Sequence, residues 1–313
     1  SSRWETNFTP TATALSGYYD IRIRVNDTDD ASTDWSSYSA VIQVVTNAPT
    51  ITSYNVIGND ILRTESSRIL VNVEDVENSD ANMTVIAQHK SPTGSWLTSY
   101  FGTPWYNNTS DLWEANFTPT TNAELGEYDI RVKVVDLDND SSNWSTYMDN
   151  ITVGNNNPIL QNYIVSSSSV LRNNTIVIGV NTADTEDSES LHTVTIQYRY
   201  ANGWSTEYLS DIWYDSSDSR WETNFTPATT ATLGDYDVRI MVNDTDEGST
   251  GWSTYNDVIT VTNNDPLLSN YGLSTSSLFR TNTTVISVNS TDIEDGESIH
   301  TVVVQYRATN GGW

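Results

Sequence analysis

The sequence contains no cysteine, and its lysines and arginines number only 14 against 41 aspartates and glutamates. Without cysteine there is no disulfide, no thiol chemistry and no zinc site built on thiolates. A formal net charge of −27 leaves no basic surface for a polyanion, so we expect no nucleic-acid partner. No apolar run is close to the roughly 18 residues of a membrane-spanning helix, and Ser1 opens no signal peptide. We expect no membrane insertion in this segment, and any leader or anchor would lie outside it.

One eight-residue stretch occurs three times and organises the chain. It reads RWETNFTP at 3–10, LWEANFTP at 112–119 and RWETNFTP at 220–227, so the period is 109 and then 108 residues. That period is too long for a solenoid unit and suits one β-sandwich domain of roughly 100 residues. The abundance of Asn, Ser, Thr and Tyr also favours strands and turns over helices. We therefore predict a tandem array of a single domain.

Domain boundaries are predicted at three short linkers rich in Asn and ending in Pro, at 46–49, 155–158 and 263–266. Each linker follows one alternating apolar segment and precedes another, which is typical of an extended connection between domains. The predicted parts are the C-terminal half of a repeat at 1–47, complete repeats at 48–156 and 157–264, and the N-terminal half of a repeat at 265–313.

Seven strands are predicted within the repeat at 157–264, and no long helix. They span 159–165, 175–181, 192–200, 207–214, 220–225, 236–243 and 256–262. Ala201-Asn202-Gly203 suits a tight hairpin turn between the third and fourth strands, since Asn and Gly accept positive φ. The same turn reads Pro92-Thr93-Gly94 and Thr309-Asn310-Gly311 in the neighbouring repeats.

A tyrosine opens the sixth strand of each repeat, at Tyr19, Tyr128 and Tyr236, after a turn that contains glycine. This arrangement resembles the tyrosine corner of immunoglobulin-like and fibronectin-like sandwiches. The chain as a whole resembles the tandem immunoglobulin-like modules, PKD-like or cadherin-like, of archaeal and bacterial cell-surface proteins, although the Cys…Trp…Cys signature of true immunoglobulin domains is missing. The resemblance implies an all-β fold of tandem seven-stranded immunoglobulin-like β-sandwich domains in a rod.

The eleven tryptophans fall in four columns of the repeat. By period-two alternation Trp221, Thr223 and Phe225 share one face of a strand, so we predict that the Trp221 column belongs to the core. Trp96 and Trp204, beside the hairpin turn, are open to a second interpretation. They would form a repeated aromatic face that stacks on sugar rings.

Two acidic loops recur in every repeat. The first acidic loop lies between the second and third strands, at 75–78, 184–187 and 292–295, and the second between the sixth and seventh, at 27–30, 136–139 and 244–247. An immunoglobulin-like sandwich brings both loops and the incoming linker to one end. Carboxylates crowded there favour calcium, a hard cation with 6–8 oxygen ligands; the alternative is that these residues form solvated turns. The candidate ligands are Asp75, Glu77, Asp136, Asp138, Asp184, Glu186, Asp187, Asp244 and Asp246.

Asn-x-Ser/Thr sequons recur, and N-linked glycans are expected on them. The column of Asn7, Asn116 and Asn224 is present in every repeat, and alternation directs it outward. The sequons are Asn7, Asn26, Asn82, Asn107, Asn108, Asn116, Asn139, Asn143, Asn150, Asn173, Asn224, Asn243, Asn282 and Asn289.

Catalytic signatures are missing. Histidine occurs only at His89, His192 and His300, and there is no Gly-x-Ser-x-Gly, phosphate-binding loop or His-Glu-x-x-His. A carboxylate pair for hydrolysis would recur in every repeat, and active sites are rarely tiled that way. We expect that the protein is not an enzyme.

The two terminal halves are complementary, since Trp313 aligns with Trp204 and Ser1 aligns with Asp218. Either the chain is a window on a longer array, or the half at 265–313 docks with the half at 1–47 of another copy, bringing Tyr306 to the strand of Trp4. The expected partners are copies of the chain or further repeats of it, head to tail.

These features favour a structural component of an extracellular surface fibre, filament or adhesin. Two alternatives stay open. One is an array of carbohydrate- or protein-binding modules, and the other is the accessory region of a large secreted enzyme.

Overall fold

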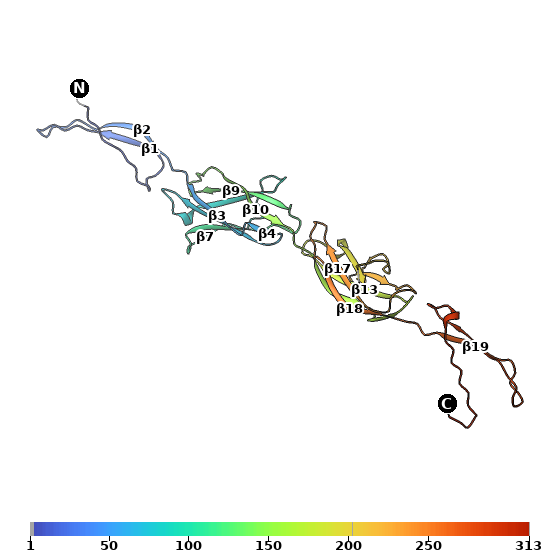
Figure 1. Ribbon diagram of the computed structural model, residues 1–313. Helices are drawn as coiled ribbons and strands as arrows, with labels where there is room; N and C mark the ends of the chain where they lie inside the picture. The colour runs from blue at the N-terminus through green and yellow to red at the C-terminus, as the bar shows by residue number, and fades with distance from the viewer. Residues whose placement is uncertain (1–2, 202, 313) are drawn as a thin grey trace. The chain divides into compact units, whose positions relative to one another are not determined.

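The structure is a computed structural model that describes residues 3–201 and 203–312. The chain divides into two compact units, Ser1–Asn155 and Asn156–Trp313. Each unit contains one eight-stranded sandwich and one separate pair of strands (Figure 1). The described residues otherwise form only three short 3-10 helices: η1 (Asp80–Asn82), η2 (Glu189–Leu191) and η3 (Glu297–Ile299). None of them has the length or the apolar character to span a bilayer.

The sandwich of the first unit packs two four-stranded sheets face to face. One sheet has the order β3-β5-β8-β7, and the other β4-β10-β9-β6. The strands are β3 (Thr50–Ile57), β4 (Asp60–Leu62), β5 (Ser67–Glu74), β6 (Thr84–Lys90), β7 (Trp105–Asn107), β8 (Leu112–Phe117), β9 (Gly126–Val135) and β10 (Ser145–Gly154). The preceding residues contribute an antiparallel pair, β1 (Gly17–Ile23) and β2 (Ser36–Val44).

The second unit repeats this topology, with sheets in the order β11-β13-β16-β15 and β12-β18-β17-β14. Its strands are β11 (Ile159–Val165), β12 (Ser169–Leu171), β13 (Ile176–Ala183), β14 (Thr193–Arg199), β15 (Trp213–Asp215), β16 (Arg220–Phe225), β17 (Gly234–Asn243) and β18 (Ser253–Thr262). The pair β19 (Leu267–Leu273) and β20 (Ile286–Thr291) follows. Two sheets with this strand order form an immunoglobulin-like sandwich, so the predicted all-β tandem fold is confirmed.

The predicted fourth strand at 207–214 is wrong. Only Trp213–Asp215 is a strand, and it pairs with β16 in the opposite sheet from β14. Isolated bridges join Tyr198 to Ser205 on one sheet and Leu209 to Phe225 on the other, so this segment crosses between the sheets. Leu209 packs against the core. Of the predicted turn at 201–203, Ala201 and Gly203 have positive φ, at 53° and 74°, and Asn202 lies outside the described residues.

A short strand that the sequence pattern did not predict follows the first strand of each sandwich. β4 pairs in parallel with β10, and β12 pairs in parallel with β18. The N-terminal segment of each sandwich therefore supplies one strand to each sheet, β3 and β4 in the first sandwich and β11 and β12 in the second. The second strand of each segment covers the edge of the last strand, β10 or β18.

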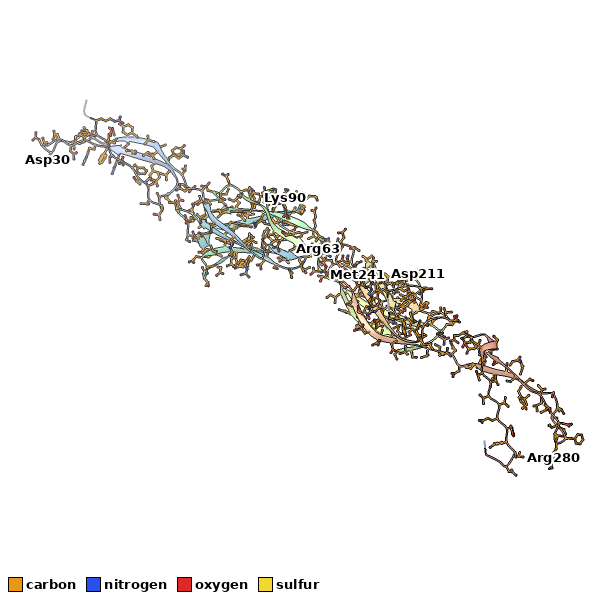
Figure 2. All side chains as sticks on the ribbon, in the orientation of Figure 1. Asp30, Arg63, Lys90, Asp211, Met241 and Arg280 are labelled. Carbon is orange, nitrogen blue, oxygen red and sulfur yellow. The ribbon has the colours of Figure 1, made fainter. Side chains whose placement is uncertain are left out.

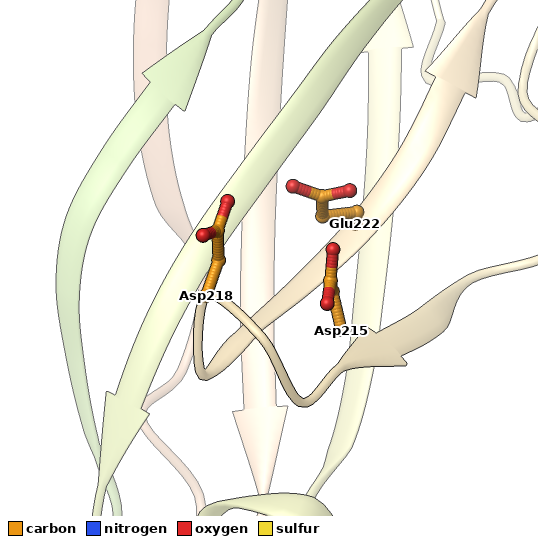
Figure 3. Close-up of side chains that lie close together, drawn as sticks. All are labelled: Asp215, Asp218 and Glu222. Atoms are coloured by element: carbon orange, nitrogen blue, oxygen red, sulfur yellow. The ribbon is translucent and has the colours of Figure 1, made fainter.

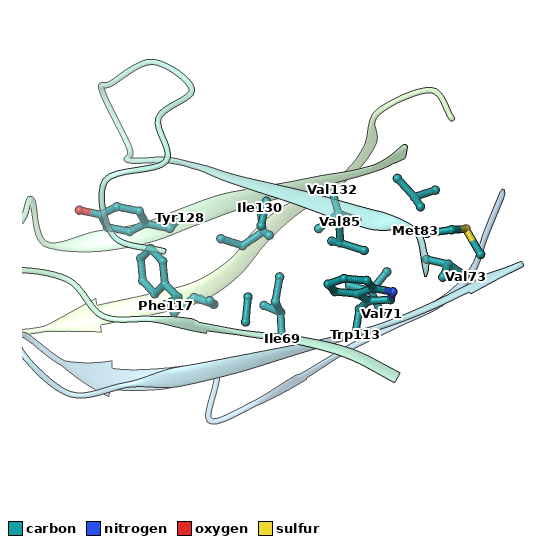
Figure 4. Close-up of a cluster of buried hydrophobic side chains, with 14 of the residues drawn as sticks. Ile69, Val71, Val73, Met83, Val85, Trp113, Phe117, Tyr128, Ile130 and Val132 are labelled. Carbon is teal, nitrogen blue, oxygen red and sulfur yellow. The ribbon is translucent and has the colours of Figure 1, made fainter. Parts of the chain in front are cut away.

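The core of each sandwich is built from the inward rows of both sheets, and Figure 4 shows the core of the first sandwich. On β8, Trp113 and Phe117 face inward, and burying each of them stabilises the fold by roughly 2–3 kcal/mol. The indole nitrogen of Trp113 donates to the Asp80 carbonyl at 2.9 Å, and that of Trp221 donates to the Glu189 carbonyl at 2.9 Å. The predicted core role of this tryptophan column is confirmed for Trp113 and Trp221, whereas Trp4, in the half repeat, is 95% exposed.

A tyrosine corner opens β1, β9 and β17. The hydroxyls of Tyr19, Tyr128 and Tyr236 donate to backbone carbonyls four residues upstream, each at 2.9 Å. Gly126, which begins β9, has φ of 121°, a conformation that side chains rarely adopt. The glycine lets the chain turn, and the hydroxyl then holds the turn closed, as predicted.

Replacing Tyr128 or Tyr236 by phenylalanine should lower the free energy of unfolding of the affected sandwich by about 1–2 kcal/mol. The reason is that a partly buried carbonyl loses its donor while the ring is kept. Urea unfolding followed by tryptophan fluorescence measures the change. Tyr18→Phe is the control, because the Tyr18 ring is 67% exposed. A control that shifts as much as the corner variants would contradict the prediction.

One buried position differs between the two sandwiches. His89 in β6 aligns with Tyr198 in β14, and each stacks on a tyrosine that follows the hairpin turn, Tyr100 or Tyr208. The His89 and Tyr100 rings are 4.4 Å apart, and His89 is 2% exposed. Burial lowers the pKa of His89 from 6.5 to about 4.

The lowered pKa makes the first sandwich sensitive to acid. Between pH 6.5 and 4 the unfolded chain binds a proton at His89 and the folded chain does not. The free energy of unfolding therefore decreases as the pH is lowered, by up to about 3 kcal/mol. His89→Tyr, which copies Tyr198, should remove this component. Urea unfolding of both proteins at pH 7 and pH 4.5 measures the difference. Equal losses in both proteins would contradict the prediction, since the carboxylates that also titrate there are common to both.

Candidate functional site: the acidic junction loops

The first acidic loop is held rigid by its leading aspartate. Oδ1 of Asp75 accepts from the backbone nitrogens of Glu77 and Asn78 at 2.8 and 2.7 Å. Asp184 and Asp292 make the same pair of contacts in the next two repeats. An aspartate that caps its own loop in this way fixes the glutamate two residues later in one orientation.

That glutamate binds the linker that enters the domain. Oε1 of Glu77 accepts from the backbone nitrogen of Asn47 at 3.1 Å and from its side-chain amide at 2.6 Å. Glu186 binds Asn156 at 3.3 and 2.5 Å, and Glu294 binds the remaining linker asparagine at 3.2 and 2.5 Å. We call this contact the linker clasp. It occurs at all three junctions with the same spacing of 30 residues.

The Asn264 clasp also reaches back to the preceding sandwich. The side-chain amide of Asn264 donates to the carbonyl of Arg172 at 3.0 Å as well as to Glu294. Arg172 itself follows β12, and its guanidinium donates to the Ala231 carbonyl at 2.8 Å. The equivalent Arg63, labelled in Figure 2, donates to the Ala123 carbonyl at 2.8 Å. One asparagine therefore bonds to backbone on one side and to a carboxylate on the other.

The second acidic loop lies beside the first. Oδ1 of Asp136 accepts from the backbone nitrogen of Asp140 at 2.9 Å, and the Thr46 hydroxyl of the linker donates to the Asp140 carboxylate. In the next repeat Oδ2 of Asp187 accepts from the backbone and hydroxyl of Thr245 at 3.1 and 2.7 Å, joining the two loops directly.

Burial and neighbouring charge shape these carboxyl groups. Burial raises the pKa of Asp136, and the negative charges of Asp140 and Asp75 add to the increase. Burial also raises the pKa of Glu186, whose carboxylate lies against that of Asp184. Such shifts occur where negative charges are brought together away from solvent.

All nine predicted ligands lie in these two loops, but they differ in burial. Asp75, Glu77 and Asp136 are half-buried or buried, whereas Asp138 is exposed. In the next repeat Asp184, Glu186, Asp187, Asp244 and Asp246 are all half-buried. Ligand atoms of three carboxylates from these loops do not all come within 4.8 Å of one another in the described residues.

A tighter carboxylate cluster that the sequence did not predict lies elsewhere, at Asp215, Asp218 and Glu222 (Figure 3). The Arg220 guanidinium lies among these carboxylates, 2.8 Å from Asp218 and 2.5 Å from Glu222. Its positive charge takes the place that a metal ion would need, so this cluster is an ion-pair network.

In the first sandwich the equivalent glutamate is neutralised by other residues, because Leu112 stands at the position of Arg220. Glu114, at the position of Glu222, accepts from the amide of Asn107 at 2.7 Å and the hydroxyl of Ser110 at 3.2 Å, and it pairs with Arg68 at 3.3 Å. The only signal in the sequence was the recurrence of glutamate in this column.

Trp96 and Trp204 contact arginine side chains rather than forming a bare aromatic face. The Arg131 guanidinium lies 4.4 Å from the Trp96 ring and 4.3 Å from the Trp144 ring. Arg239 lies 4.5 Å from Trp204 in the same arrangement. Both tryptophans are half-buried. These cation–π contacts compete with the ring faces that a sugar would need.

None of the fourteen sequon asparagines is buried. Nine are exposed: Asn7, Asn26, Asn82, Asn108, Asn139, Asn143, Asn173, Asn282 and Asn289. Two of the half-buried ones are already bonded, because Asn107 donates to Glu114 and Asn150 accepts from the Tyr54 hydroxyl at 2.6 Å. Asn116 and Asn224 are half-buried on their strands.

No family model and no curated protein sequence matches the chain. Among solved structures it is similar to the titin domains Z1Z2, with a TM-score of 0.38 and 13% identity, over 71% of this chain and 100% of that one. It is also similar to the Escherichia coli adhesin FdeC (TM-score 0.27, 13% identity, 80% and 77% covered). Fibronectin(III)-like modules of Clostridium thermocellum CbhA match with a TM-score of 0.26 and 14% identity, over 68% and 94%. At these identities the likeness concerns the fold alone.

Arg220→Leu, which copies Leu112, should lower the stability of the second sandwich by about 1–3 kcal/mol, because Glu222 keeps its charge and loses its counter-ion. Adding Glu222→Gln should restore most of the loss. Arg3→Leu is the matched control from the same column, since the Arg3–Glu5 pair is exposed to solvent. Urea unfolding measures all three variants, and a double variant no better than the single one would contradict the prediction.

Proposed function

We propose that this chain is a structural part of an extracellular surface fibre, filament or adhesin, and that its repeated domains set the distance between the parts on either side. The linker clasp is the observation that carries the proposal. Asn47, Asn156 and Asn264 bind a glutamate in the domain that follows, so each linker is attached to its next domain in the same way. An enzyme or a single binding module has no need for an identical contact at every junction.

Surface display is supported by the sequons. Glycans on the exposed asparagines would shield strand edges against pairing and proteolysis, which matters for sandwiches that have open edges. A net charge of −27 acts in the same direction by keeping neighbouring chains apart.

The faces of the two strand pairs support association with further repeats. In each complete sandwich a tyrosine of the first strand stacks on one of the last, Tyr54 on Tyr147 at 3.7 Å and Tyr163 on Tyr255 at 4.0 Å. The corresponding residues of the separate pairs, Tyr38 and Tyr271, are 51% and 71% exposed. We propose that these faces are covered by complementary strands from further repeats of the same chain or from another copy, head to tail.

A carbohydrate-binding array is the weaker alternative. It needs free aromatic faces, and arginines stack on Trp96 and Trp204.

Asn156→Ala should loosen the attachment of the linker to the second sandwich, because the side-chain hydrogen bond to Glu186 is lost while the backbone one remains possible. Small-angle X-ray scattering of the chain measures this as a broader distribution of distances, with Asn55→Ala, an exposed asparagine of β3, as the control. A wild-type chain already as flexible as the variant would contradict the role of the clasp. Immunogold labelling of intact cells tests the location separately, and label confined to the interior would overturn surface display.

A further inference from the structure

Two segments of the half repeats have the sequence of a strand but do not form one. Residues 3–8 read RWETNF, identical to β16, and residues 301–307 read TVVVQYR, which differs from β14 at two positions. Both segments are described and exposed along their whole length, and neither belongs to a strand. In the complete sandwich β16 pairs with β13, and β14 pairs with β17. Each of these partners comes from the other half of the repeat.

The aromatic side chains that fill the core of a complete sandwich are exposed in the half repeats. Phe225 is fully buried, whereas Phe8, in the same column, is 50% exposed. Tyr198 is 5% exposed, and Tyr306, in its column, is 93% exposed. Removing such apolar surface from water is the main driving force for folding and association. Among the described residues, each half therefore has a core face that no second sheet covers.

Between them the two halves have the sequence of seven of the eight strands of a sandwich. The half at 1–47 contributes β1, β2 and the column of β16, and the half at 265–313 contributes β19, β20 and the columns of β12 and β14. Only β15 has no equivalent within these residues, and β15 is a three-residue strand at the edge of its sheet. Joining the halves would therefore restore both sheets with all their inner strands.

We propose that the half at 265–313 of one copy of the chain and the half at 1–47 of a second copy associate into one hybrid immunoglobulin-like sandwich. This inference deepens the head-to-tail association in the proposed function and rests on it, and it names the partner as a second copy of the same chain. Each copy has one face of each kind, so the contact is heterologous and repeats from copy to copy along a filament.

Charge complementarity at the join favours this partner. In the second sandwich Arg199, the last residue of β14, pairs with Asp237 of β17 at 2.7 Å, and the first sandwich has a lysine–aspartate pair in the same columns at 3.0 Å. The equivalent residues of the two halves are Arg307 and Asp20, again of opposite charge. Arg307 donates to the Gly311 carbonyl at 3.4 Å, a long contact that strand pairing would replace.

The half at 1–47 already holds its polar side chains as a complete sandwich does. Oδ1 of Asp20 accepts from the backbone nitrogen of Ala40 at 2.6 Å, and the Arg22 guanidinium lies 4.5 Å from the Trp35 ring. The equivalent groups of the second sandwich make the same two contacts, at 2.9 and 4.0 Å. There the arginine also donates twice to a glutamine of β14, whose equivalent is Gln305. Side chains fixed before association lose less entropy on binding.

Sedimentation equilibrium of residues 1–313 tests the association. We expect the average mass to rise with concentration above that of one chain. Asp20→Arg and Arg307→Asp should each weaken the association at least tenfold, because like charges then meet at the join. Asp60→Arg is the matched control, since it changes the net charge as Asp20→Arg does but lies exposed on β4 of a complete sandwich. A control that weakens the association equally would overturn the proposed join.

Mixing the two variants identifies the partners. In an equimolar mixture Asp20 of the Arg307→Asp chain meets Arg307 of the Asp20→Arg chain, which is the wild-type pair. Association should therefore return, although each variant alone associates weakly. This recovery requires the half at 1–47 of one copy to bind the half at 265–313 of another. A mixture no stronger than its components would overturn the proposal.

Amide hydrogen exchange locates the contact. Residues 3–8 and 301–307 should become protected as the concentration rises, because both segments then pair as strands, while protection of β18 should stay unchanged. A chain that is monomeric at every soluble concentration, or one that associates without this protection, contradicts the proposal. Protection independent of concentration also contradicts it, because the halves then close on each other within one chain. None of these outcomes bears on surface display, which immunogold labelling tests separately.

Discussion

Each sandwich depends on one aromatic contact between its two sheets. Phe117 of β8 packs on Tyr128 of β9 with ring centres 5.6 Å apart, and Phe225 packs on Tyr236 at 5.9 Å. These four residues are at most 2% exposed. Because the tyrosine hydroxyl must also reach a loop carbonyl, the contact sets both the separation of the sheets and the register of the strand that carries the phenylalanine. A slip of one residue would turn Trp113 and Phe117 to the solvent.

Around this contact, two positions have the same role in both sandwiches but are filled by different residues. A flat ring must fill the space beside Tyr100 or Tyr208, and histidine does so in one sandwich and tyrosine in the other. A buried glutamate on the outer face must be balanced, and Arg68 with Asn107 does so in one sandwich and Arg220 in the other. Of the two rings, only His89 makes the stability of its sandwich depend on pH between 6.5 and 4.

The junction contact recurs as regularly as the aromatic columns of Trp221, Phe225 and Tyr236. The Asn–Glu clasp uses the same residue types at all three junctions, and the glutamate divides its two oxygens between the linker and the interior of the acidic loops. The proposed spacing role therefore depends on one glutamate at each junction.

The sequence by itself determined the repeat, the all-β fold, the inward row of Trp221 and Phe225 and the tyrosine corner, since these depend on period, alternation and local turns. It also brought the two acidic loops to one end through the topology of the sandwich. Only the tertiary structure decided that 207–214 crosses between sheets, that Arg220 neutralises its carboxylates and that arginines stack on Trp96 and Trp204. Those outcomes depend on which distant side chains meet, and the spacing of residues along a strand carries no information about the partner on the other sheet.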